Sequence, residues 1–122
     1  MMCSNIEKLI EKLQGGNREW EKAFSELMSF QNAGIELERD GRLEEAVRQY
    51  KQAVKLGEND ERFKVNNYFY SIERLVIVCR KLKKYDDEIR VINLALSSDL
   101  SDSDRKKMSA RLEKAIKLKD KI

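Results

Sequence analysis

The 122-residue sequence contains no histidine and no proline, and it has only two cysteines and five glycines. Without histidine, the chain lacks the commonest general base and the commonest metal ligand. Cys3 and Cys79 lie too far apart to match a metal-binding spacing or a disulfide framework. Gly15-Gly16 lacks the lysine and hydroxyl residue that follow a phosphate-binding loop. We therefore expect no enzyme, no catalytic residues, no metal and no cofactor.

Long hydrophobic runs are also missing. No apolar stretch approaches the roughly 20 residues that a membrane span needs. Residues 1–16 carry Glu7, Lys8, Glu11 and Lys12 between their apolar positions, so they lack the continuous apolar core of a signal peptide. We expect a cytoplasmic protein with no membrane partner.

Hydrophobic residues make up 41% of the chain and charged residues 39%. Strands are disfavoured because alternating apolar and polar runs are absent. A chain of this length suits one domain, and the composition suits helices with solvated outer faces. The sequence therefore predicts a single all-α domain.

The most regular pattern predicts two helices joined by a tight turn at Asp40-Gly41. Glycine takes a positive φ at no steric cost and commonly follows the last residue of a helix. Apolar and small residues recur at helical spacing on both sides of this turn. Before it they are Ala23, Leu27, Phe30, Gly34 and Leu37, and after it Leu43, Ala46, Val47, Tyr50, Ala53 and Val54. We expect the small residues among them to let the two helices approach closely.

This helical hairpin resembles a tetratricopeptide repeat, whose usual period is about 34 residues. The matching positions are Phe30, Ala33, Gly34, Leu37, Gly41, Ala46, Tyr50 and Ala53. The proline that often ends such a repeat is absent, and Glu58 stands near its place. A generic pair of antiparallel helices is the alternative interpretation.

A weaker copy of the pattern follows forty-two residues later, where Ile72, Cys79, Ile92 and Ala95 correspond to Phe30, Leu37, Tyr50 and Ala53. Two small positions are lost, because Val76 replaces Gly34 and Glu88 replaces Ala46. We expect the second hairpin to pack less closely. We also expect the surplus over the usual period to lengthen the start of a helix running from about residue 60 to 84.

The expected architecture is a short superhelix of two such hairpins between two capping helices. Its parts are an N-terminal capping helix at residues 1–16, repeat one at 18–57, repeat two at 59–98 and a C-terminal capping helix at 101–122. Helix ends are expected at Gly15-Gly16 and Gly57, and an N-cap at Ser101 or Asp102. Tyr85-Asp86-Asp87 is expected to open a helix that runs to about Leu96, because acidic residues complement the dipole at a helix start. Caps are needed because the end of a repeat array leaves an apolar face uncovered.

Apolar residues near these caps allow further expectations. Trp20 and Phe24 are expected to pack on the first helix, or else to form the aromatic edge of a binding surface. The inner stripe of the last helix is expected to consist of Met108, Leu112, Ala115 and Ile116. Cys79 lies on an apolar helix face and is expected to be buried and unreactive.

The resemblance implies that the first helix of each hairpin lines a concave groove that binds a peptide or a helix of another protein. Carried over position by position, its apolar anchors are Met28, Ile35, Tyr70 and Ile77. The polar residues beside them are Gln31, Glu38, Arg39, Glu73, Arg74, Arg80 and Lys81. Alternatively, the terminal helices cover Met28, Ile35 and Ile77.

Some members of the family clamp the C-terminal carboxylate of a peptide with lysine and asparagine. Here those positions hold Gln31, Ile35 and Arg74, and a third full repeat is lacking. This departure argues against binding of chaperone tails by such a clamp.

Two other functions remain open: self-association as a homodimer, and nucleic-acid contact through the last helix. Residues 105–122 hold eight Lys or Arg against two acids. That segment lacks the aromatic side chains on which single strands stack, so nucleic acid is the less favoured partner.

Overall fold

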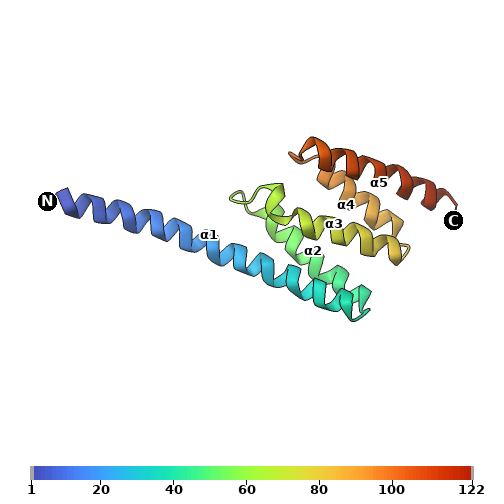
Figure 1. The fold of residues 1–122 in the computed structure, drawn as a ribbon, viewed down its shortest axis with the longest axis horizontal. Coiled ribbons are helices and arrows are strands. Elements are labelled where there is room, and N and C mark those ends of the chain that lie inside the picture. Colours follow the sequence, from blue (N-terminus) through green and yellow to red (C-terminus); the bar gives the residue numbers. More distant parts are fainter. Residues whose placement is uncertain (1, 122) are drawn as a thin grey trace.

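The computed structural model describes residues 2–121 for the backbone and 18–121 for the side chains, and these residues form α-helices joined by short connections, with no strand among them. The helices are α1 (Met2–Arg39), α2 (Leu43–Asn59), α3 (Val65–Lys81), α4 (Tyr85–Leu96) and α5 (Asp102–Asp120). Each helix packs against the next one in the chain, so the stack proceeds in sequence order from α1 to α5 (Figure 1). The predicted all-α class is confirmed.

Side-chain contacts sort these helices into two layers. α1, α3 and α5 form the odd layer, joined by Gln31–Ser71, Glu38–Arg74, Glu73–Lys107 and Arg80 with the Arg111 carbonyl. α2 and α4 form the even layer, joined by Glu44–Lys84 and Lys51–Asp87. Because α5 belongs to the odd layer, it continues the array as well as covering α4.

The turns that close the two hairpins have the same geometry. Gly41 has φ 76°, and Lys83, forty-two residues later, has φ 59°. The amide after Gly41 donates to the Leu37 carbonyl at 2.9 Å, and the amide after Lys83 donates to the Cys79 carbonyl at 2.8 Å. The internal repeat inferred from the apolar pattern is therefore also a repeat of backbone conformation.

Close helix packing depends on two glycines. A Cβ at Gly34 would lie 2.7 Å from the Tyr50 ring, which confirms that a small residue lets α1 and α2 approach. A Cβ at Gly57 would lie 2.3 Å from the Tyr68 ring. The expected helix end at Gly57 is wrong, since α2 continues to Asn59 and this glycine is needed for contact with α3.

The expected start of the next helix near residue 60 is also wrong. α3 begins at Val65, where the Asn67 side chain accepts a hydrogen bond from the Lys64 amide at 2.8 Å. Instead of capping a helix, Asp60 binds Arg62, with an Oδ1–Nε distance of 3.0 Å. The surplus over the usual repeat period forms a connection that buries Phe63, so tertiary packing prevents a longer α3.

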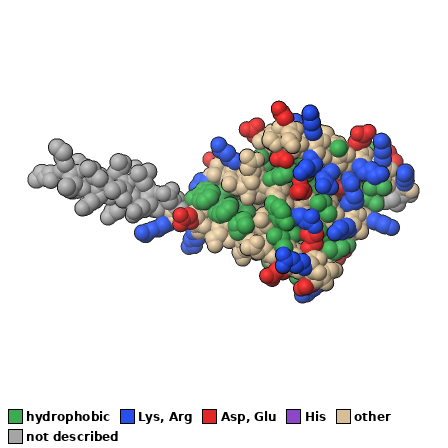
Figure 2. Space-filling model, in the orientation of Figure 1, with side chains coloured by type: hydrophobic (Ala, Val, Ile, Leu, Met, Phe, Trp, Pro, Cys, Tyr) green, Lys and Arg blue, Asp and Glu red, His purple; other side chains and the backbone are tan. Residues whose placement is uncertain are grey.

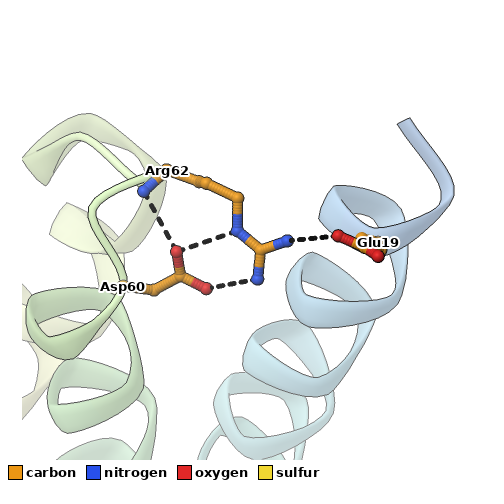
Figure 3. A network of polar contacts seen from close by, with 3 residues as sticks. All are labelled: Glu19, Asp60 and Arg62. Atoms are coloured by element: carbon orange, nitrogen blue, oxygen red, sulfur yellow. Dashed lines mark hydrogen bonds and ion pairs between the residues drawn. The ribbon is translucent and has the colours of Figure 1, made fainter. Parts of the chain in front are cut away.

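Phe63 completes an aromatic cluster with two residues of α1. The rings of Trp20 and Phe24 stack at 4.9 Å, and Phe63 meets Trp20 edge-on at 6.0 Å. Beside the cluster, Arg62 binds Asp60 and reaches Glu19 of α1 at 3.8 Å (Figure 3). Trp20 and Phe24 thus pack against the α2–α3 connection, and the expectation that they pack on a separate first helix is wrong.

The expected break at Gly15-Gly16 is likewise wrong, because α1 is one helix from Met2 to Arg39. Two helical glycines lower helix stability by only about 1 kcal/mol each, which good helix formers on both sides can offset. The expected capping contacts of residues 1–16 lie outside the described side chains.

The C-terminal hairpin follows the sequence more closely. α4 begins at Tyr85 and ends at Leu96 as expected, and Ser101 caps α5 by accepting from the Asp104 amide at 3.2 Å. Met108 and Ala115 are fully buried and Leu112 is half-buried. Ile116 is 44% exposed, so its expected place in the inner stripe is wrong.

The repeated turn gives a stability prediction. Lys83 adopts a left-handed backbone conformation that is unfavourable for residues with a Cβ atom. Lys83→Gly should therefore raise the free energy of unfolding by about 0.5–1 kcal/mol. Gly41→Ala should lower it by about 1 kcal/mol for the same reason. Urea unfolding followed by circular dichroism measures both. Equal effects of the same sign at the two positions would contradict the shared geometry.

Candidate functional site

A surface groove of about 330 Å³ lies between α1 and α3 in the odd layer. It is lined by Ile35, Glu38, Arg39, Tyr50, Tyr70 and Arg74. Tyr70 is 48% exposed, and Arg39 is exposed and bonds no other described side chain. The groove therefore combines an accessible aromatic ring with a free guanidinium group.

A carboxylate that joins three helices forms the floor of the groove. Tyr50 of α2 donates to Glu38 Oε1 at 2.9 Å, and Arg74 of α3 donates to the same oxygen from Nε at 3.1 Å. A second Arg74 nitrogen binds Glu38 Oε2, and Lys81 Nζ lies 4.0 Å from that oxygen. These contacts hold the side chains of the floor in place.

In the floor of the groove, a negative charge is paired with positive charges. Burial alone would raise the pKa of Glu38, but the hydrogen bonds from Arg74 and Tyr50 and the nearby cations hold the Glu38 pKa below its ordinary value. Burial and the neighbouring carboxylate raise the pKa of Tyr50. Glu38 is thus ionised and already paired, which leaves no free anion in the groove.

Gln31 and Met28, both expected to face the groove, contact each other below its surface. The buried Gln31 accepts a hydrogen bond from Ser71 at 2.9 Å and donates to the Met28 sulfur at 3.7 Å. The expectation that Gln31 is a groove residue is wrong, because a buried amide needs polar partners and finds them between α1 and α3.

Glu73 and Arg80, also expected to line the groove, bind α5 and α4. Lys107 lies 3.1 Å from Glu73, and Arg80 donates to Glu88 at 2.8 Å and to the Arg111 carbonyl at 2.9 Å. Glu88 is fully buried, and this burial raises its pKa against the opposing effect of Arg80. A carboxylate at the position where repeat one has an alanine needs a cation, so Arg80 turns away from the groove.

Of the eleven residues expected from the sequence to line the groove, the structure brings five together. They are Ile35, Glu38, Arg39, Tyr70 and Arg74. Ile77 is half-buried and does not line the groove. Tyr50 was expected only as a packing residue, because nothing in the sequence indicates that its hydroxyl reaches Glu38.

Cys79 is buried in the core and does not line the groove. Burial raises the pKa of the Cys79 thiol to about 11, so this cysteine is a buried hydrophobic residue as expected. Within the described part of the chain, no three His, Cys, Asp or Glu side chains are grouped to hold a metal ion. Nor does any helix there combine the length and apolar character needed to cross a membrane.

Comparisons with protein-family models, with curated proteins and with solved structures found no match. The proposed function below is therefore based on the geometry of the groove.

The Glu38 network predicts a pH-dependent contribution to stability. A carboxyl with a lowered folded pKa stabilises the protein above its ordinary pKa of 4.5, and that contribution is lost as pH falls through the folded pKa. Glu38→Gln should lower the free energy of unfolding at neutral pH by about 1.5–3 kcal/mol, because it removes charged hydrogen bonds.

Urea unfolding across the acid range tests this expectation. The variant and the original protein should converge as pH falls below 4.5. Glu73→Gln is the matched control, since its more exposed pair with Lys107 should contribute about 0–1 kcal/mol. Curves for Glu38→Gln that stay parallel to those of the original protein would contradict the network.

The pair between the half-buried Arg80 and the fully buried Glu88 predicts a non-additive pair of substitutions. Glu88→Ala leaves the Arg80 charge without its partner and should lower the free energy of unfolding by about 2–3 kcal/mol. Arg80→Met combined with Glu88→Leu should lose less than Glu88→Ala alone, because the Arg80 charge is removed together with its partner. Thermal unfolding compares the variants, with exposed Glu113→Ala as control. A double variant that loses at least as much stability as Glu88→Ala would refute the pairing.

Proposed function

We propose that the protein is a non-catalytic interaction module of the tetratricopeptide type that binds a peptide or helix of another protein along α1 and α3. The observation that carries this proposal is the groove itself, which is lined by the exposed Tyr70 and by Arg39, whose guanidinium group bonds no described side chain. Tyrosine and arginine are among the side chains most enriched where proteins bind one another.

The floor of the groove supports the same function. Its polar groups are already bonded among Glu38, Tyr50 and Arg74, so a partner does not need to satisfy buried charges there. A surface that is ordered before binding reduces the entropy lost on association. The half-buried Ile35 adds apolar contact next to the tyrosine ring.

The contacts of α5 weaken the nucleic-acid alternative. Four of its cations bond to the protein: Arg105 to carbonyls of residues 96 and 98, Lys107 to Glu73, Lys117 to Glu113 and Lys119 to Asp86. Fewer cations are then left for phosphates. Self-association stays a separate prediction, which sedimentation of the full chain tests.

A selection of short random peptides displayed on phage tests the proposed function. Peptides that bind the original protein should lose about tenfold or more in affinity for the variant Tyr70→Ala with Arg39→Ala, measured by fluorescence anisotropy. Helix content and melting temperature should change little, because both side chains are exposed.

The matched control combines Ile116→Ala with Arg48→Ala. Ile116 is the other exposed large hydrophobic residue in the described part of the chain, and Arg48 is an exposed arginine of α2. The control should bind normally. Equal losses in both variants, or the absence of any selected peptide, would overturn the proposal.

A further inference from the structure

Two exposed cations of the odd layer lie on the helices that frame α3. Arg39 of α1 and Lys114 of α5 are exposed, and neither bonds a described side chain. Between them, Lys81 of α3 is exposed, and its Nζ lies 4.0 Å from Glu38 Oε2. These three residues are called the basic row below.

The position of Lys114 follows from contacts between α3 and α5. Glu73 of α3 pairs with Lys107 of α5, and Arg80, later in α3, contacts Arg111, later in α5. Because both partners advance together, the two helices run in the same direction, with an offset of 34 to 31 residues. At that offset Lys81 lies opposite residues 112–115. Lys114 is seven residues after Lys107 and therefore lies on the same face of α5.

Two acids that contacts place on the face between α1, α3 and α5 are already paired. Glu38 binds Tyr50 and Arg74 in the groove floor, and Glu73 binds Lys107. Asp40, next to Arg39 in the chain, is exposed in the turn after α1. On the face that these contacts define, the charges left free for a partner are the cations of the basic row. Figure 2 shows many Lys and Arg side chains, with Asp and Glu side chains among them, over the part of the molecule far from the grey N-terminal residues.

We infer that the partner of the proposed groove is an acidic segment of another protein that crosses α1, α3 and α5 in turn. This inference rests on the proposed function and adds the chemistry of the partner and the participation of α5. Carboxylates of the segment pair with the basic row, and an apolar side chain of the segment contacts Tyr70 and Ile35.

The geometry sets the length and spacing of the segment. Directly packed helices lie about 8–10 Å apart, whereas α1, α3 and α5 contact one another mainly through side chains. A path from α1 to α5 therefore covers at least about 20 Å, or at least about six residues of extended chain. Carboxylates at least about three residues apart then reach successive cations. The recognition uses acidic side chains within the segment, so a free C-terminal carboxylate is not required.

The selected peptides provide the test. The sequences enriched on the original protein should contain more Asp and Glu than the starting library, and amidation of the C-terminus should leave affinity unchanged. Binding should weaken as salt rises, since exposed charge pairs are screened.

Charge-reversal variants locate the contact. Arg39→Glu combined with Lys114→Glu should weaken an acidic peptide by about tenfold or more, and Lys114→Glu alone should account for part of that loss. The matched control is Arg48→Glu with Lys55→Glu, which reverses two exposed cations of α2. That control should change affinity by less than about twofold.

Failure of this inference is distinguishable from failure of the proposed function. Peptides that depend on Tyr70 but show no excess of acids would overturn the acidic partner and leave the groove as the binding site. Full binding by Lys114→Glu would remove α5 from the interface. Equal weakening by both charge-reversal pairs would show only long-range attraction and would also overturn the inference.

Discussion

The Glu38 carboxylate is the contact on which the arrangement of the odd layer depends. It receives hydrogen bonds from α2 through Tyr50 and from α3 through Arg74, so one side chain of α1 connects three helices. A half-buried carboxylate is stable there because it is bonded on both oxygens. The same network forms the floor of the groove, which links the stability of the stack to the shape of its proposed binding surface.

In the second hairpin, a different residue connects its first helix to the next helix of the odd layer. Arg80 stands forty-two residues after Glu38 and also reaches the next helix of the odd layer, where it binds the Arg111 carbonyl. Its own hairpin supplies Glu88 as the counter-charge. The duplicated backbone thus retains a polar side chain that bridges to the following helix, although its charge has changed sign. This bridge explains why α5 continues the layer beyond two hairpins.

The ion pairs inside the odd layer determine which charges stay exposed on its surface. Acids that pair inside the layer leave cations as the exposed charges on the surface of the layer. Arg39 and Lys114 are the clearest examples. The exposed Tyr70 supplies the apolar contact that charge alone lacks. A partner therefore needs both features, which gives specificity that neither a basic patch nor an aromatic ring provides separately.

The sequence by itself determined the features that depend on neighbouring residues: helical periodicity, the glycine turn at Gly41, the start of α4 at Tyr85 and the cap at Ser101. Tertiary structure decided the rest. Gly57 lies inside a helix because the Tyr68 ring occupies the space of its missing side chain, and α3 starts late because Phe63 is drawn into the core. Gln31 and Arg80 do not lie on the predicted surface, because each binds a partner from another helix, Ser71 and Glu88 respectively. Helical spacing shows which face a residue occupies, but only the packed neighbours decide whether that face binds solvent, a partner or the protein itself.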